Sequence, residues 1–229
     1  MHATAALIIP ALNEAVVIGT TIATIPPGLF SVVIVADNGS TDGTGDVARR
    51  AGATVVHEPR RGYGSACLAA LRAVPAATTA AVFMQADGSE NPAEATRLLA
   101  PIYEGRADLV IGSRTLGHSQ PGALTLQQQA GNRVATLLMR WIYGHRFTDL
   151  GPFRAIRLDA LRRLGMAETN YGWTVEMQVR ALKRGLRILE IPITYQRRVA
   201  GENKISGNIA NSIRAGTRIL WTVLRLSGS

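Results

Sequence analysis

Four short segments of the sequence combine carboxylate, amide and hydroxyl side chains in a pattern that suits nucleotide and metal chemistry. An acid such as Asp37, placed where a buried strand ends, can accept hydrogen bonds from a base or a ribose. Asp87, with Gln85 and Ser89 beside it, offers the hard oxygen ligands that Mg²⁺ and Mn²⁺ prefer. Taken singly, each segment is equally typical of a turn or a helix cap. The segments are Asn13-Glu14, Asp37-Asn-Gly-Ser-Thr-Asp-Gly-Thr44, Gln85-Ala-Asp-Gly-Ser89 and Gly112-Ser-Arg114.

A fifth segment, Arg60-Arg-Gly-Tyr-Gly64, opens a predicted helix with two glycines. Glycines allow close backbone approach, and the N-terminus of a helix attracts phosphate. The pattern is weak by itself. It is neither the full dinucleotide fingerprint nor a Walker loop, since no Gly-Lys-Ser/Thr occurs in the chain.

The elements that must position these segments are alternating strands and helices in the first half of the chain. Helix-like stretches near 14–24, 43–51, 64–73 and 92–103 separate continuous apolar runs, which predict buried parallel strands covered on both faces. Ligands of such sheets bind at the carboxyl ends of the strands. The polar segments follow these runs, so their side chains are expected to meet at one site. The predicted strands are Ala5–Ile9, Val32–Ala36, Thr54–His57, Ala80–Met84 and Asp108–Ile111.

The second half has a different character. A long amphipathic stretch covers about 124–143, a loop-to-strand element follows at 148–154, and short helices are expected near 157–164 and 172–184. A strand at 187–195 leads through a polar loop into a final helix over about 207–226. In that helix Arg214, Arg218 and Arg225 share one face.

Charge is distributed unevenly along the 229 residues, whose formal net charge is +9. Residues 1–112 hold seven Arg against ten acids, a net −3, whereas residues 113–229 hold 18 Arg and Lys against six acids, a net +12. This asymmetry indicates an anionic partner for the second half. A GC-rich genome accounts for much of the preference for Arg over Lys, but less well for its placement.

Taken together, the motifs resemble those of family 2 glycosyltransferases, and within them the dolichyl- or polyprenyl-phosphate glycosyltransferases. The resemblance covers roughly residues 4–205. It implies an α/β GT-A (Rossmann-like) fold, with a mostly parallel central sheet flanked by helices and a C-terminal helical extension on the acceptor side. We therefore expect one domain over 1–229, in which 1–112 binds the nucleotide sugar and 113–229 the acceptor. The matching segments are 9–14, 37–44, 62–64, 85–88, 112–114, 132–133 and 149–154.

The resemblance also implies roles for individual residues. The donor, a UDP- or GDP-sugar, is expected to contact a set drawn from the first half: Pro10, Asn13, Glu14, Asp37, Ser40, Gly62, Gly64, Gln85, Ala86 and Asp87. Acceptor and phosphate groups are assigned to Arg114, Arg133, Arg198 and Lys204. A Mg²⁺ or Mn²⁺ ion is expected on Asp87, with Gln85 and Ser89 as further ligands.

One position departs from the family pattern, because Gln85 stands where Asp is usual. A neutral amide contributes no charge, so metal affinity should fall unless Asp87, Ser89 and the diphosphate suffice. Charge that develops on the leaving diphosphate is stabilised by a cation and by Arg or Lys. An inverting single displacement is implied. A phosphate acceptor needs little help from a base, whereas a hydroxyl acceptor needs a carboxylate. Asp149 is the candidate, with Glu176 weaker, although Asp149 could equally be a cap or support Arg154.

The leading functional hypothesis is sugar transfer to a polyprenyl phosphate at the cytoplasmic membrane face, with peripheral attachment to anionic lipid. The alternatives are the same donor chemistry with a soluble phosphorylated or hydroxyl acceptor, and a non-catalytic nucleotide-sugar-binding homologue. No signal peptide and no membrane-spanning run is predicted. Nucleic-acid binding is disfavoured because no such module appears, zinc is improbable with scattered histidines, and homo-oligomerisation is left open.

Overall fold

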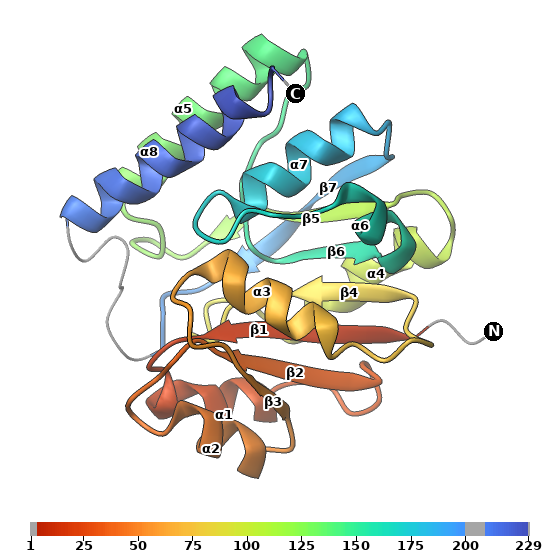
Figure 1. Ribbon diagram of the computed structural model, residues 1–229, viewed down its shortest axis with the longest axis vertical. Helices are drawn as coiled ribbons and strands as arrows, with labels where there is room; N and C mark the ends of the chain where they lie inside the picture. The colour runs from red at the N-terminus through yellow and green to blue at the C-terminus, as the bar shows by residue number, and fades with distance from the viewer. Residues whose placement is uncertain (1–3, 200–208, 229) are drawn as a thin grey trace.

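The structure, a computed structural model, describes residues 4–199 and 209–228 and is built on one mixed sheet (Figure 1). The strand order in this sheet is β3-β2-β1-β4-β6-β5-β7. β6 runs antiparallel to both of its neighbours, and the other pairs are parallel. The strands are β1 (Ala5–Ala11), β2 (Val32–Asp37), β3 (Thr54–His57), β4 (Ala80–Phe83), β5 (Leu109–Ser119), β6 (Arg154–Arg157) and β7 (Ile188–Tyr195).

Helices cover both faces of the sheet and create two hydrophobic cores. Successive side chains of a strand point to opposite faces of the sheet, so one strand contributes to both cores. In β1, Leu7 and Ile9 point into one core and Ile8 into the other. One core lies under α1 (Ala15–Ala23), α2 (Thr44–Arg50) and α4 (Ala95–Tyr103), which follows the short η1 (Pro92–Glu94). The other lies under α3 (Tyr63–Arg72), α6 (Leu158–Leu164) and α7 (Trp173–Lys183). Burial on two faces is why the central strands are continuously apolar.

Two long helices, α5 (Leu126–Tyr143) and α8 (Ile209–Arg225), lie side by side at one end of the molecule (Figure 1). α5 begins at a capping box in which Thr125 and Gln128 exchange hydrogen bonds, and ends at Gly144 with φ 70°. The hydroxyl of Tyr143 donates to the carbonyl oxygen of Val223 at 2.7 Å, which ties the two helices together. No described helix is long and apolar enough to cross a bilayer.

The strands and helices expected from the sequence are present, and the GT-A-like fold is confirmed, but β5 differs from the expectation. It does not end at Ile111: it continues through Gly112-Ser-Arg114 to Ser119. Its pairing with β7 carries it on, with a register shift between Ser113 and His118. The expected boundary between the two halves, at 112, therefore falls inside a strand.

Candidate active site

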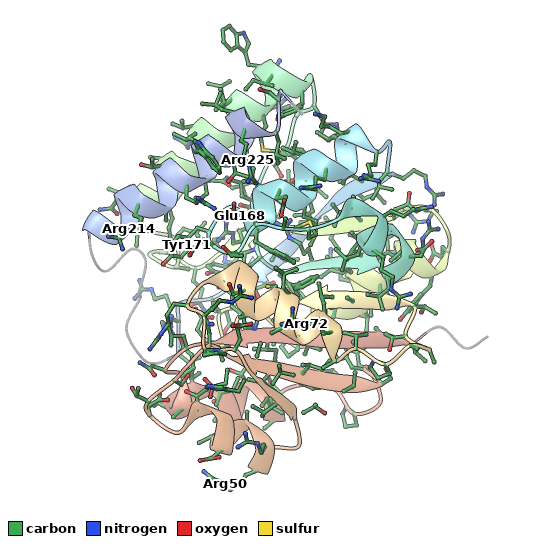
Figure 2. The ribbon with its side chains drawn as sticks, in the orientation of Figure 1. Arg50, Arg72, Glu168, Tyr171, Arg214 and Arg225 are labelled. Atoms are coloured by element: carbon green, nitrogen blue, oxygen red, sulfur yellow. The ribbon has the colours of Figure 1, made fainter. Side chains whose placement is uncertain are left out.

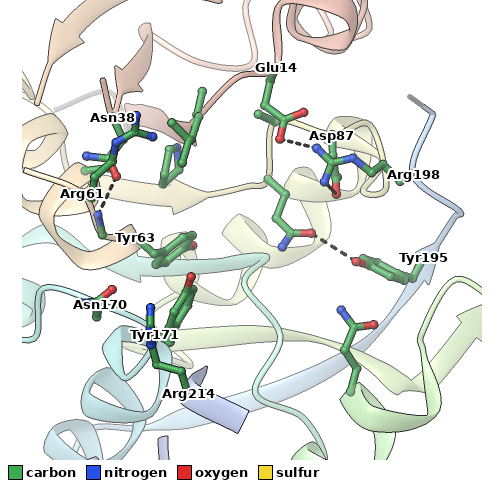
Figure 3. Close-up of a pocket in the computed structure, with 18 residues that line it drawn as sticks. Glu14, Asn38, Arg61, Tyr63, Asp87, Asn170, Tyr171, Tyr195, Arg198 and Arg214 are labelled. Carbon is green, nitrogen blue, oxygen red and sulfur yellow. Dashed lines mark hydrogen bonds and ion pairs between the residues drawn. The ribbon is translucent and has the colours of Figure 1, made fainter. Parts of the chain in front are cut away.

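A pocket of about 440 Å³, called the main pocket here, opens where β1, β2 and β4 end (Figure 3). Side chains from both halves of the chain line it, as expected for the carboxyl edge of a parallel sheet. The described residues that line it are Pro10, Ala11, Leu12, Glu14, Asn38, Arg61, Gly62, Tyr63, Ala66, Gln85, Ala86, Asp87, Gln128, Asn170, Tyr171, Tyr195, Arg198 and Arg214.

A second cavity of about 230 Å³, the side pocket, adjoins it between α5, α8 and the segment after Asp149. The two pockets share Tyr63, Gln85, Gln128 and Tyr171, so a molecule in each would meet at these side chains. Arg114 is the one charged residue among the described residues of the side pocket. The others are Gln127, Gly131, Asn132, Leu150, Pro152, Thr174, Ala215, Gly216 and Ile219.

Amide side chains fasten the loop after β2 to the loops after β1 and β3. The Asn38 amide donates to the carbonyls of Glu58 and Arg60 at 3.0 and 2.6 Å, and accepts from the Gly62 amide at 2.8 Å. Asn13 similarly accepts from the backbone of Thr41 at 2.9 Å, with its own backbone at φ 49°. These bonds fix the wall of the main pocket before any ligand binds.

Asp87 and its neighbours form the oxygen-rich side of the main pocket. One Asp87 oxygen, Oδ1, accepts from the backbone amide and the hydroxyl of Ser89 at 3.0 and 2.6 Å. The Gln85 side-chain oxygen accepts from the Ser89 hydroxyl and the Tyr195 hydroxyl, both at 3.2 Å. The three predicted metal ligands therefore lie together.

The donor set fits a divalent cation that arrives with a diphosphate. Within the described part of the chain no cluster of three or more His, Cys, Asp or Glu could cage an ion. Mg²⁺-type sites commonly use one or two carboxylates and complete their shell with substrate phosphates and water. Glu90, buried behind Gln85, adds little negative charge because burial raises its pKa to about 8. Asp87 with the Gln85 and Ser89 oxygens matches this arrangement.

Arg198 reaches into the same side of the main pocket from the chain after β7. Its guanidinium pairs with Glu14, as a dashed line in Figure 3 shows. The same guanidinium lies 3.5 Å from the Asp87 oxygen Oδ2. Arg61, Arg214 and Arg198 all line this pocket, so three guanidiniums face a space that also contains two carboxylates. Such a mixture suits a metal-bound anion such as a nucleoside diphosphate.

Arg114 in the side pocket is held by Asp149. Arg114 Nε and Nη2 donate to the two Asp149 oxygens at 2.8 and 2.7 Å, and the Arg114 backbone amide donates to one of them at 2.8 Å. Burial opposes the Arg114 charge, but the Asp149 carboxylate outweighs it and raises the Arg114 pKa above its usual value. Asp149 is 1% exposed. The pair presents a fixed cation to the side pocket, and the Asp149 carboxylate faces Arg114 rather than that pocket.

The buried carboxylate of Glu168 fastens α8 to the rest of the protein, and Figure 2 shows Glu168 close to Arg225 of this helix. Glu168 receives two hydrogen bonds from Arg218, at 2.9 and 3.0 Å, and an ion pair from Arg225 at 3.7 Å. Each of these guanidiniums also lies over the Trp221 ring, with its central carbon 4.8 Å (Arg218) or 4.7 Å (Arg225) from the ring centroid. The basic stripe expected to face an anionic surface therefore has a partner inside the protein at Arg218 and Arg225, while Arg214 lines the main pocket.

The sequence of this chain matches a known protein family. A family model described as glycosyl transferase family 2 matches residues 6–165, more than half of the chain. The chain belongs to glycosyltransferase family 2.

Relatives of this family 2 glycosyltransferase share most of their length with it. An uncharacterized glycosyltransferase of Mycobacterium tuberculosis is 38% identical over 213 residues, which cover 91% of this chain and 93% of the relative. The undecaprenyl-phosphate mannosyltransferase of Micrococcus luteus is 35% identical, covering 95% of this chain and 96% of the relative. The polyprenol monophosphomannose synthase of Mycolicibacterium smegmatis is 30% identical, covering 77% and 71%.

The solved structures of glucosyl-3-phosphoglycerate synthase from Mycobacterium tuberculosis share the fold. The complex of that enzyme with Mn²⁺, UDP and glucosyl-3-phosphoglycerate has a TM-score of 0.78 and 24% identity, covering 99% of this chain and 80% of the other. At this identity the likeness establishes the GT-A fold of the glycosyltransferase, and the acceptor has to be argued from its own pockets.

Most of the site residues expected from the sequence come together, in three different ways. Pro10, Glu14, Gly62, Gln85, Ala86, Asp87 and Arg198 line the main pocket, and Arg114 lines the side pocket. Asn13, Asp37 and Ser40 hold the loops after β1 and β2 together instead. The Asn13 backbone amide donates to Ser40 Oγ, and the Ser40 backbone amide donates to Asp37 Oδ1. Ser89 supports Asp87.

Three further residues expected at the site are not found among the described residues that line either pocket. Gly64 packs against the Glu168 carbonyl, where a side chain would clash. Arg133 is exposed on α5 and is not among the described residues of either pocket. Lys204 lies outside the described residues.

Several residues that line the main pocket were not predicted as site residues from the sequence. They are Asn38, Arg61, Tyr63, Asn170, Tyr171 and Tyr195. Asn38 and Arg61 each lie inside a segment that the sequence analysis singled out, so their position in the motif was a usable signal. Asn170 and Tyr171 reach the pocket because the Ser65 amide donates to the Thr169 carbonyl at 2.9 Å, a contact between segments about a hundred residues apart. No pattern in the sequence around either segment predicts that contact.

Proposed function

We propose that this family 2 glycosyltransferase moves a hexosyl group from a nucleoside-diphosphate sugar to a polyprenyl phosphate. The observation that carries the proposal is the side pocket. Leu150, Pro152 and Ile219 give it an apolar wall, and Arg114 is its one charged residue among those described. A single fixed cation beside an apolar surface suits a phosphate head with a hydrocarbon tail. A small, multiply charged acceptor would call for more polar and cationic groups.

The main pocket is proposed to hold the donor. Asn38 and Pro10 shape the wall where the base and ribose would lie, and Arg61, Arg198 and Arg214 would bind the diphosphate. Asp87, with the oxygens of Gln85 and Ser89, would hold Mg²⁺ or Mn²⁺. When bound, this cation supplies positive charge to the leaving diphosphate.

The acceptor is proposed to react from the side pocket in a single inverting displacement. Asp149 occupies Nε and Nη2 of Arg114, which leaves Nη1 to bind an acceptor oxygen. A phosphate oxygen is already anionic near neutral pH, so attack on the sugar carbon needs no general base. We therefore assign Asp149 as a positioning residue that orients Arg114, in place of the base expected from the sequence.

Attachment to the cytoplasmic face of the membrane is part of the proposal. α5 exposes Leu126, Val134, Leu137 and Trp141 on its outer surface, and Trp141 is 89% exposed. Arg133 and Arg140 lie exposed on the same helix. Apolar side chains with interspersed cations suit a helix that lies in the interface of an anionic bilayer. The names of the Micrococcus and Mycolicibacterium relatives agree with a lipid-linked acceptor.

A transfer assay that compares two acceptors tests the proposal. The purified chain is incubated with radiolabelled UDP- and GDP-sugars, GDP-mannose first, together with Mn²⁺ and either undecaprenyl phosphate or 3-phosphoglycerate. We expect label to partition into organic solvent and to be released by mild acid, as for a sugar linked to a lipid phosphate. Turnover with the water-soluble acceptor and none with the polyprenyl phosphate would overturn the proposal in favour of a soluble acceptor. Binding of nucleotide sugars without turnover on any acceptor would favour the non-catalytic alternative.

A further inference from the structure

The guanidinium of Arg198 stands where it can serve both carboxylates of the main pocket. It pairs with Glu14 and lies 3.5 Å from the Oδ2 oxygen of Asp87. The Glu14 and Asp87 side chains are 8% and 13% exposed, and that of Arg198 is 20% exposed. An ion pair that is this well shielded from water is worth more than a surface pair.

Backbone pairing, rather than side-chain reach, brings Arg198 to this place. The Gln196 amide donates to the Ser89 carbonyl at 2.8 Å, and the Val199 amide donates to the Asp87 carbonyl at 3.2 Å. Val199 also packs on Gly88, where an added Cβ would come within 2.8 Å of its Cγ2 atom. The chain around Arg198 therefore runs beside Asp87, and the guanidinium need not swing in from solvent.

Both Asp87 oxygens are engaged in this arrangement. Oδ1 accepts from the amide and hydroxyl of Ser89, and Oδ2 faces Arg198 Nη1. A cation that ligates Oδ2 must displace this guanidinium nitrogen or share the oxygen with it. Gln85, which is neutral, does not add the second carboxylate that would favour the cation in that competition.

From these contacts we infer that Arg198 is an internal competitor for Asp87, which makes the site select a metal–nucleotide complex over the free metal. In the empty pocket, the guanidinium partly neutralises Asp87 and disfavours a lone divalent cation. A bound diphosphate offers Arg198 a second anion, so the guanidinium turns toward phosphate oxygens and leaves Oδ2 to the metal. The inference rests on the proposed function, because it takes Asp87 as the metal ligand.

Binding measurements without turnover test this competition. Mn²⁺ is titrated into the nucleotide-free chain and followed by electron paramagnetic resonance and calorimetry, for the wild type and for Arg198→Gln. We expect the variant to bind free Mn²⁺ about 3- to 10-fold more tightly, since a shielded ion pair no longer opposes it. The same variant should bind UDP or GDP without metal about tenfold more weakly, because a phosphate ligand is lost. If Arg198 had a merely structural role, the substitution would not strengthen binding of free Mn²⁺ while weakening binding of the nucleotide.

Arg197→Gln is the matched control. Arg197 is adjacent in sequence and its Nε donates to the Pro121 carbonyl at 2.6 Å, away from Asp87, so the substitution changes the overall charge equally. Arg198→Lys keeps the charge and is expected to stay close to the wild type for free Mn²⁺. Thermal melting of each variant checks that it folds.

Two outcomes separate this inference from the proposed function. If Arg198→Gln binds free Mn²⁺ no more tightly than Arg197→Gln, while Asp87→Asn abolishes Mn²⁺ binding, the competition is refuted and the metal site stands. If Asp87→Asn leaves Mn²⁺ binding unchanged in the presence of nucleotide, the metal assignment itself fails, and the inference fails with it.

Discussion

At the scale of single residues, the contacts between Arg114 and Asp149 bear on the proposed activation of the acceptor. A carboxylate that is 1% exposed and bonded through both oxygens to a guanidinium is poorly placed to take a proton from a substrate. The same carboxylate holds Arg114 over the Tyr195 ring, with its guanidinium carbon 5.3 Å from the ring centroid. Under the proposed function, the pair therefore orients a guanidinium for a phosphate acceptor.

We expect Asp149→Asn to raise the KM for the acceptor at least tenfold, because an amide cannot pair with both nitrogens of Arg114 in the charged way a carboxylate does. The KM for the donor should stay within about twofold. The decisive readout is the pH profile of kcat/KM over pH 5.5–9. A positioning role leaves the shape of the profile unchanged, whereas loss of an acidic limb in the variant would identify Asp149 as the general base after all.

A second residue-scale prediction concerns stability in acid. Hydrogen bonds from Arg187 to Asp108, the residue just before β5, lower the Asp108 pKa to about 2. A depressed carboxylate pKa contributes stability above the unfolded value near 3.8, and that contribution is lost as pH falls toward 2.

Asp108→Asn should therefore lower the melting temperature by a few degrees at pH 7, on the order of 1 kcal/mol, and the gap to the wild type should close between pH 4 and 2. Calorimetry at several pH values checks this. A gap that stays constant down to pH 2 would contradict the assigned cause. Asp46→Asn, on the exposed surface of α2, is the control for a general change of charge.

At the scale of elements, α8 is the helix whose position matters most, because it lines both pockets with Arg214, Ala215, Gly216 and Ile219. Its anchor is Glu168, whose side chain is fully buried. The same segment continues into Asn170 and Tyr171 of the main pocket, and the backbone of Asn170 donates to Glu168 at 3.0 Å. One carboxylate thus joins α8 to a wall of the main pocket.

Glu168→Gln should loosen α8 while keeping the shape of the site. Two guanidiniums would face a neutral amide, and opening of α8 would become easier by about 2–4 kcal/mol. Hydrogen exchange over 214–225 should accelerate, and acceptor KM should rise by at least tenfold. Glu104→Gln, which affects an exposed pair with Arg106, is the matched control. Unchanged exchange in α8 would show that the contacts of Tyr143 and Lys183 with this helix hold it without Glu168.

Elements are also where prediction from the sequence succeeded best. Continuous apolar runs located the strands because burial on two faces leaves a local signature. Partners distant in the sequence leave none. Asp149 was expected to support Arg154 if it was structural, yet it binds Arg114, and Arg154 donates to the carbonyls of Gly151 and Thr174. The spacing of the α8 arginines predicted a solvent-facing basic stripe. Arg218 and Arg225 instead pair with the buried carboxylate of Glu168, which lies 50 residues before Arg218 in the sequence.

At the scale of the whole molecule, the charge asymmetry of the sequence resolves into two uses of arginine. Some guanidiniums, such as Arg218, fasten elements to each other, and others, such as Arg114 and Arg198, face the pockets. The proposed membrane-facing surface rests on the exposed apolar side chains of α5 more than on charge. Leu137, 65% exposed, and Trp141 have no described partner helix on that face.

Replacing Leu137 and Trp141 together by Ser should weaken binding to anionic vesicles by at least tenfold, because two apolar side chains no longer enter the bilayer interface. Co-sedimentation with vesicles of phosphatidylglycerol and phosphatidylcholine measures this. Turnover of a short-chain polyprenyl phosphate in solution should be unchanged. Val16→Ser, which removes an exposed apolar side chain from α1, is the control. If the double variant sediments like the wild type, α5 is not the membrane-facing element.

The position of β6 has a consequence for how this chain is made. β5 pairs with β6 and β7, and both of these strands follow it in the sequence. During synthesis, β1 to β4 can pair as soon as they emerge, whereas Leu109–Ser119 must wait for at least Arg154 before it gains a neighbour. Its apolar edge is meanwhile unpaired, which is the condition under which nascent chains aggregate. The part of the sheet made by β5, β6 and β7 is thus the last to form and the most exposed to misfolding.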